Sequence, residues 1–188
     1  MRVLIACEES QVVCKAFRTL GQEAYSCDTE PCSGGHPEWH FQCDVAEVLG
    51  DGWDLIIAHP PCTYLAVSGN RWYSKRPDLY EPAAEFAMQF FDYADKVALE
   101  NPVGRLSKIW RPPDQYVHPY WFGDPVEKKT GLWLKNLPLL VPTNEVKPPP
   151  RQQVKGGKSL PEWYSNAPKK DRAKIRAKTF EGFANAMA

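Results

Sequence analysis

A cysteine and a glutamate–asparagine pair are the residues of this 188-residue chain best placed to do chemistry. Cys62 follows the apolar run Leu55–Ala58, which is typical of a parallel strand buried on both faces, and two prolines that end this strand because they lack backbone donors. Glu100 and Asn101 end a second apolar run, and the residues between the two runs suffice for a crossover helix. Ligands bind at the carboxyl ends of such strands, so we expect a nucleophilic thiol, an acid–base carboxyl and an amide at one sheet edge. The alternative is a small cysteine that is simply packed after a rigid turn.

The N-terminal segment predicts a nucleotide-binding β–α–β unit. Residues 2–6 predict a first strand, residues 12–20 a helix, and residues 23–27 a second strand that ends at Asp28. An acid in that place accepts hydrogen bonds from ribose hydroxyls. The loop after the first strand has no glycine and carries two adjacent glutamates, which would repel a pyrophosphate but suit a sulfonium or an amino group. This loop argues against NAD or ATP as the ligand.

Further elements are predicted from apolar spacing, prolines and turn residues. They are a short strand over residues 41–43 followed by a turn that Asp44 caps, a helix over 82–94, a late strand over 132–134, an extended segment over 139–141, a loop over 151–166 and a mostly helical end over 168–188.

Composition indicates a globular chain of one domain. Apolar residues make up 43% and charged residues 24%, and no apolar run approaches the roughly 20 residues of a membrane span. The six cysteines have no disulfide-scaffold spacing, which favours free thiols in a reducing compartment, and we expect a cytoplasmic protein. A set of soft ligands has irregular spacing without a Cys-x-x-Cys pair, so no metal is expected there: Cys27, Cys32, His36, His40 and Cys43.

The strand ends described above resemble those of the DNA (cytosine-5) methyltransferases. In that family a Pro-Cys motif carries the nucleophile and a Glu-Asn-Val triplet holds the target base; here these are Pro61-Cys62 and Glu100-Asn101, with Pro102 in the third place. The Ser68-Gly69 pair also matches the family's loop after the cysteine. The resemblance implies an α/β, Rossmann-like S-adenosylmethionine-dependent methyltransferase fold, with a mostly parallel central sheet and helices on both faces. It further implies a single catalytic domain over residues 1–188, as in a short, phage-like or minimal member.

The resemblance also implies the residues that bind S-adenosylmethionine. Asp28 would bind the ribose and Asp44 the adenine amino group. The remaining expected cofactor contacts lie in the first loop and beside the cysteine: Ala6, Glu8, Ser10 and Pro60.

A third family motif is recognisable between Trp121 and Leu134. The family has an aromatic-Gly-x-Pro-Gln-x-Arg-x-Arg segment here, and laid onto this chain Val126 replaces the glutamine, Lys128 the first arginine and Thr130 the second. Lys128 therefore joins Cys62, Glu100 and Asn101 as an expected catalytic residue. An ammonium does not reproduce the bidentate fork of arginine, but Thr130 can add a hydrogen bond.

The charge distribution predicts a nucleic-acid partner. Residues 145–178 hold ten basic and three acidic residues, a net +7 on a chain whose overall net charge is zero. Residues 135–170 would form a reduced recognition region, and Arg71-Trp72-Tyr73 would stack a base or bind phosphate. A solvated basic tail and an ordinary surface loop remain the alternatives.

These features together predict methyl transfer from S-adenosylmethionine to carbon 5 of cytosine in DNA, through a covalent adduct of Cys62 with carbon 6. The target base would be flipped or single-stranded, because carbon 6 is out of reach inside a duplex. Two other functions stay open. One is a catalytically silent nucleic-acid-binding protein of the same fold, and the other is an enzyme that modifies free pyrimidine nucleotides.

Overall fold

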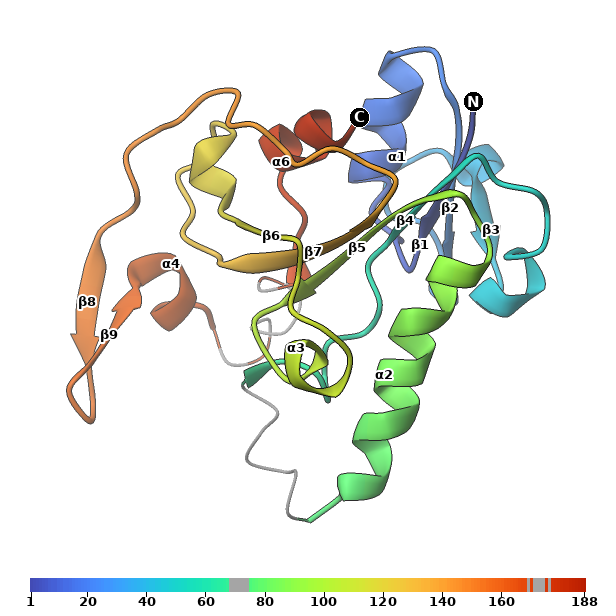
Figure 1. Cartoon of the computed structure of the whole chain (residues 1–188). Helices are drawn as coiled ribbons and strands as arrows, with labels where there is room; N and C mark the ends of the chain where they lie inside the picture. The colour runs from blue at the N-terminus through green and yellow to red at the C-terminus, as the bar shows by residue number, and fades with distance from the viewer. Residues whose placement is uncertain (68–74, 169, 171–174, 176) are drawn as a thin grey trace.

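The computed structural model describes residues 1–67, 75–168, 170, 175 and 177–188, and within them seven strands form one twisted sheet (Figure 1). The strand order is β3-β2-β1-β4-β5-β7-β6; the pairs from β3 to β5 are parallel, and β7 is antiparallel to both its neighbours. The strands are β1 (Arg2–Ala6), β2 (Glu23–Asp28), β3 (His40–Gln42), β4 (Leu55–Ala58), β5 (Lys96–Pro102), β6 (Gln115–Val117) and β7 (Thr130–Lys135). The predicted Rossmann-like, mostly parallel sheet is confirmed.

Helices cover both faces of the sheet, as predicted. On one face lie α1 (Val12–Thr19) and α6 (Glu181–Met187), and on the other lie α2 (Tyr80–Met88) and α3 (Leu106–Ile109). Short 3₁₀ turns connect these elements: η1 (Pro37–Trp39), η2 (Val45–Glu47), η4 (Pro77–Leu79), η5 (Gln89–Asp92) and η6 (Pro119–Trp121).

The central strands are apolar throughout because both of their faces are covered. In β1, Val3 and Ile5 pack in one core cluster with α1, while Leu4 and Ala6 pack in the other with α2. All four side chains are fully buried. Alternating residues of a strand point to opposite faces, so a run without polar residues fits a sheet between two helical layers.

Two helices have other boundaries in the structure than those predicted from the sequence. The helix predicted over 82–94 begins earlier, at Tyr80, with Pro82 in its first turn, where a missing N–H costs nothing, and it continues as the 3₁₀ turn η5. The predicted helical end is only partly helical in the described residues, because α6 starts at Glu181 and Lys178–Phe180 have no regular structure.

A hairpin that the sequence pattern did not predict lies beside the main sheet. Strands β8 (Arg151–Val154) and β9 (Lys158–Pro161) pair antiparallel, followed by the single helical turn α4 (Glu162–Ser165), where a loop was predicted. Figure 1 shows this unit standing away from the seven-stranded sheet. The strands are short and mostly polar, so their alternation is weak, but Gly156 and Gly157 both adopt the positive φ that a tight hairpin connection requires. The loop prediction was wrong because that glycine pair was not recognised as a hairpin turn.

Three predictions fall on residues outside the described ranges. They are Ser68-Gly69, the Arg71-Trp72-Tyr73 cluster and part of the basic segment, namely Lys169, Arg172, Lys174 and Arg176. Among the helices of the described part of the chain, none combines the length and the apolar character needed to cross a membrane.

Candidate active site

Parallel pairing brings the predicted catalytic residues to one edge of the sheet. Ala6 pairs with Ala58, and Ala58 pairs with Leu99, where the parallel pairing ends. Cys7 and His59 leave the sheet at this edge, and Glu100 lies beside them in β5, which continues to Pro102 paired with β7. This is the edge at which ligands bind in open α/β sheets.

Glu100 is largely buried, and several neighbouring side chains interact with its carboxylate. Its side chain is only 13% exposed, and its Oε2 lies 3.3 Å from Nδ1 of His59. Antiparallel pairing places Thr130 of β7 across from Pro102 of β5, from where the threonine hydroxyl donates to the same carboxylate. Burial acts to raise the pKa of Glu100, but Lys128, His59 and Thr130 outweigh it and hold the pKa at about 2. The carboxylate is therefore ionised at neutral pH in the free protein, which differs from the neutral acid that its expected role requires.

Asn101 joins the two strand ends. It is fully buried, and its Nδ2 donates to the carbonyl oxygen of Pro60 over 3.2 Å. Its Oδ1 is buried without a partner among the described residues. Since buried polar atoms are nearly always hydrogen-bonded, this oxygen is a free acceptor at the site. Asn101 thus fixes the Pro-Pro-Cys turn relative to β5.

Cys62 lies half-buried beyond that turn, where Ala66 N donates to its carbonyl oxygen over 2.8 Å. Burial raises the pKa of the Cys62 thiol, the charge of Glu100 adds to this rise, and Lys128 opposes it. The free protein therefore holds Cys62 as a thiol, and the nucleophilic thiolate must form when a substrate is present.

The backbone that follows Cys62 is clamped to the backbone that follows Asn101. Arg105 N donates to Leu65 O over 2.7 Å, and Ala66 forms a bridge with Gly104. A Cβ at Gly104 would lie 1.8 Å from Leu65 O, so only glycine allows this approach. The clamp fixes the cysteine loop to the Glu100 strand.

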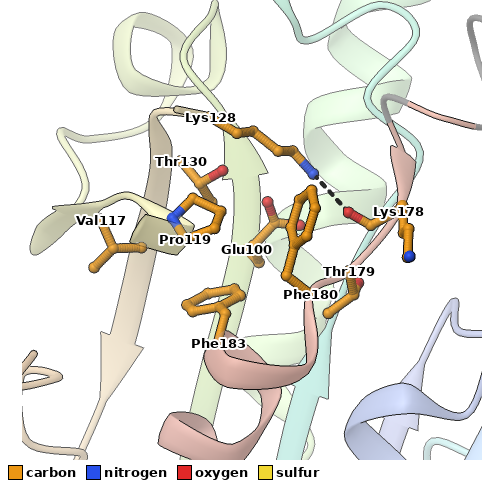
Figure 2. A pocket seen from close by; sticks show the side chains of 9 residues that line it. All are labelled: Glu100, Val117, Pro119, Lys128, Thr130, Lys178, Thr179, Phe180 and Phe183. Carbon is orange, nitrogen blue, oxygen red and sulfur yellow. Dashed lines mark hydrogen bonds between the residues drawn. The ribbon is translucent and has the colours of Figure 1, made fainter. Parts of the chain in front are cut away.

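Lys128 closes the site from the C-terminal side. Its Nζ donates to the carbonyl oxygen of Lys178 over 3.4 Å, and Figure 2 shows the Lys128 side chain above Glu100 and pointing toward the C-terminal segment. A small pocket lies between these parts, lined by Glu100, Val117, Pro119, Lys128, Thr130, Lys178, Thr179, Phe180 and Phe183. Its enclosed space of about 10 Å³ matches about one water molecule, so Phe180 and its neighbours must shift before a larger group can enter.

The sequence analysis missed His59 and Phe180 as site residues. His59 had a recognisable signal, because it directly follows the strand that delivers the cysteine. Phe180 had none, since only the tertiary fold brings the C-terminal segment across to β5.

The expected cofactor residues lie at the same edge, next to Cys7. Burial raises the pKa of Cys7 to about 12, and the charges of Asp28 and Asp44 add to the rise, which places both carboxylates close to this thiol. Asp44 caps η2 by accepting from Ala46 N over 2.9 Å, as predicted. Two acids from the ends of β2 and β3 therefore flank the loop after β1.

Of the other expected cofactor residues, Ala6 and Pro60 form hydrogen bonds through their backbone, and Ser10 forms one through its side chain. Ala6 is buried and its carbonyl oxygen accepts from His59 N over 3.0 Å. Pro60 is buried, and its carbonyl oxygen is engaged by Asn101. The side chain of Ser10 hydrogen-bonds the carboxylate of Glu8.

Glu8 does not offer its charge to a ligand in this structure, contrary to the expectation. It is 4% exposed, and its two carboxylate oxygens accept from Val13 N over 2.7 Å and Cys14 N over 3.1 Å. These are unpaired amides of the first turn of α1, so Glu8 caps the helix. Burial raises the pKa of Glu8, while the charge of His59 and the two amides lower it.

The first loop turns without glycine. Cys7 and Gln11 have φ values of 59° and 57°, in the left-handed region that glycine usually serves. The carboxylate of Glu8 and the fully buried side chain of Gln11 stabilise the loop, since Gln11 Nε2 donates to His36 O over 2.7 Å. Hydrogen bonds of these two side chains thus stabilise backbone conformations that glycine would adopt without strain.

The five soft ligands of the β2–β3 region do not converge. His40 contacts Ser26, His36 stacks on Trp39, and Cys27 lies 3.9 Å from Cys43 between their sulfur atoms. In the described part of the chain, no three histidine, cysteine or acidic side chains are grouped as a metal site would require.

The backbone clamp gives a first prediction. Gly104→Ala should destabilise the fold by about 1–3 kcal/mol and should speed alkylation of Cys62, because Leu65 O must retreat from the new methyl group. Gly50→Ala is the matched control, since a Cβ there meets nothing within 4 Å. Urea unfolding and peptide-mapped alkylation measure both effects. Equal behaviour of the two variants would contradict the clamp.

The ionised Glu100 gives a second prediction. A carboxyl whose pKa falls from its ordinary 4.5 to about 2 on folding stabilises the protein above pH 4.5, and this stabilisation is lost as pH falls towards 2. Wild type should therefore lose about 3 kcal/mol more than Glu100→Gln over this range. Denaturant unfolding at several pH values measures the difference, with the exposed Glu145→Gln as control. Parallel curves for wild type and Glu100→Gln would show that the carboxylate is not held in this way.

Comparison with solved structures places the fold among methyltransferases. The S. pombe Dnmt2 methyltransferase matches with a TM-score of 0.51 at 13% identity, over 74% of this chain and 51% of that one. The Entamoeba histolytica methyltransferase EhMeth matches with a TM-score of 0.54 at 13% identity, over 78% of this chain and 57% of that one. The chain therefore spans somewhat more than half the length of these proteins. No protein-family model and no curated protein matches the chain. At this identity the likeness shows a shared methyltransferase-type fold.

Proposed function

We propose that this protein transfers a methyl group from S-adenosylmethionine to carbon 5 of cytosine in DNA, through a covalent bond between Cys62 and carbon 6. One observation carries the proposal. A thiol, a buried carboxylate and a buried amide converge at the ligand-binding edge of a methyltransferase-type fold, and Asn101 ties them together through Pro60. The fold alone supports many reactions, so the argument rests on this site.

The side chains around the loop after β1 offer hydrogen-bond acceptors that match the donors of S-adenosylmethionine. Asp28 and Asp44 provide carboxylates for ribose hydroxyls and an adenine amino group, and both lie close to Cys7 in the first loop. The loop offers no cluster of cations for a pyrophosphate, and it turns at Cys7 and Gln11 as a ligand-binding loop must. When bound, S-adenosylmethionine supplies the methyl group as an electrophile.

The chain's own residues would prepare the base for this transfer. Carbon 5 of cytosine is a poor nucleophile until a thiolate adds to carbon 6 and produces an enamine. Glu100 faces the ring nitrogen N3, where a proton makes carbon 6 more electrophilic. Asn101 holds the cysteine turn against β5, and Lys128 balances the charge of Glu100.

DNA is the proposed partner because of charge. The exposed cations Arg151, Lys155 and Lys158 lie on or beside the β8–β9 hairpin, within the segment of net charge +7. Arg151 is tied to Glu127, the neighbour of Lys128, which connects the hairpin to the active site. Basic side chains beside the site would hold the phosphate backbone while the base enters.

All six cysteines are free, which suits the cytoplasmic location we propose.

Binding of the cofactor is testable by calorimetry. Asp28→Ala and Asp44→Ala should each weaken S-adenosylmethionine binding by about 10- to 100-fold, the cost of a hydrogen bond to a charged group. Asp51→Ala, an exposed acid in a turn, is the matched control and should bind as wild type does. Thermal melting of each variant separates lost contacts from lost folding. Equal binding by all four proteins would remove both acids from the site.

The covalent step is testable with a blocked substrate. Fluorine at carbon 5 of cytosine prevents the final elimination, so incubation with fluorocytosine DNA and S-adenosylmethionine should give a complex that resists denaturation. The complex should be absent from Cys62→Ser, because a hydroxyl is far less acidic than a thiol, and present in the control Cys32→Ser.

The same experiment with the free fluorinated nucleotide separates a DNA enzyme from a nucleotide enzyme. An adduct with DNA alone supports the proposal, and an adduct with the nucleotide alone replaces DNA as the substrate. Folded, cofactor-bound protein that forms no adduct with either would refute the thiol mechanism.

A further inference from the structure

His59 is held between the two strand ends that build the site. It is the first residue after β4, and its backbone N–H donates to Ala6 O over 3.0 Å. Its side chain is 10% exposed, and Nδ1 lies 3.3 Å from Oε2 of Glu100. A carboxylate ionised at neutral pH only accepts hydrogen bonds, so Nδ1 carries the hydrogen.

Two buried carboxylates act on this ring. Glu100 accepts from it, and the charge of Glu8, which caps α1, interacts with it as well. The other ring nitrogen, Nε2, is buried without a partner among the described residues. Beyond Glu100 lie Lys128 and Cys62, which complete the charged and titratable groups that act on the pair. The form of the ring that can give up the Nδ1 proton is the imidazolium, whose positive charge these two carboxylates face.

The proposed reaction needs a proton that Glu100 does not hold. Thiolate addition to carbon 6 pushes electrons onto N3, which must gain a proton as the bond forms. The pKa of Glu100 is about 2, so in the free protein this group is a bare carboxylate. Of the groups that act on Glu100, His59 is of the side-chain type that most readily donates and accepts protons in enzymes.

We propose that His59 is the positioning residue that supplies this proton through Glu100; the inference rests on the function proposed above. The Nδ1 proton passes to Glu100, which delivers a proton to N3 as the Cys62 sulfur bonds carbon 6. The thiol's own proton goes to solvent. Once carbon 5 carries the methyl group, its proton leaves to solvent and the bond between sulfur and carbon 6 breaks. The departing thiolate takes a proton from solvent, and the N3 proton returns through Glu100 to His59. The histidine ends the cycle as it began.

Replacing His59 by asparagine distinguishes proton donation by the ring from a purely structural role of the side chain. In His59→Asn an amide nitrogen takes the place of Nδ1, so the bond to Glu100 remains while the transferable proton is lost. Single-turnover methyl transfer should fall by about 10²- to 10³-fold. Wild type should lose activity as pH rises, as a reaction that needs a histidine proton does, and His59→Asn, which has no ionisable ring, should lack this fall. A variant with the rate and pH profile of wild type would overturn the relay.

His36→Asn is the matched control. His36 also pairs with a glutamate, Glu38, over 3.1 Å, but both side chains are exposed and neither contacts Glu100. This variant should keep the rate and the pH profile of wild type. Calorimetry with S-adenosylmethionine and thermal melting show whether each variant is folded.

A measurement on the ring itself does not depend on activity. The chain has four histidines, so ¹⁵N-histidine labelling gives a simple spectrum. In Glu100→Gln the ring-nitrogen signals of His59 should move relative to wild type, because the acceptor that faces Nδ1 has lost its charge, while the signals of the other three histidines should not move. Unchanged His59 signals would overturn the coupling, even if His59→Asn fails to fold.

The two proposals fail in different ways. Wild-type protein that methylates neither DNA nor nucleotide refutes the proposed function, and the relay with it. Active wild type with a fully active His59→Asn refutes the relay alone.

Discussion

The buried carboxylate of Glu100 is the constraint on which the site depends. An ionised group with 13% exposure is costly unless its charge is balanced and its oxygens are hydrogen-bonded. Three different parts of the chain provide this balance: His59 after β4, Lys128 before β7 and Thr130 within β7. The antiparallel strand β7 therefore does more than extend the sheet. It brings a hydroxyl and an ammonium to a group that β5 delivers from the other direction.

The same charge influences the cysteine. Glu100 raises the pKa of Cys62 while Lys128 lowers it, so the thiol, the carboxylate and the ammonium form one electrostatic unit. A substrate that takes up a proton from this unit would weaken the negative charge facing the thiol and make thiolate formation easier. The small pocket beside Phe180 adds a conformational constraint, because its lining must shift before a group larger than water can enter.

The first loop shows how a ligand-binding turn can form without glycine. Cys7 and Gln11 take left-handed conformations that cost non-glycine residues free energy, and the buried bonds of Glu8 and Gln11 offset this cost. The glutamate that looked like a ligand contact is instead part of the loop's support. Its charge also acts on His59, so the helix cap and the active site are electrostatically connected.

The sequence by itself determined the sheet core and which residues lie at the carboxyl ends of its parallel strands. Unbroken apolar runs such as Leu55–Ala58 fit only strands covered on both faces, and the prolines after them mark where the strands end. The resemblance had grouped Lys128 and Thr130 with Glu100, but the tertiary structure alone decided that His59 and Phe180 also lie around it, because they come from segments far apart in the chain. The capping role of Glu8 likewise depends on the tertiary structure. Only there is it visible where α1 begins and that Val13 N and Cys14 N point at the Glu8 carboxylate. Local pattern fixes which side chains a strand presents, whereas their charge state and partners depend on long-range packing.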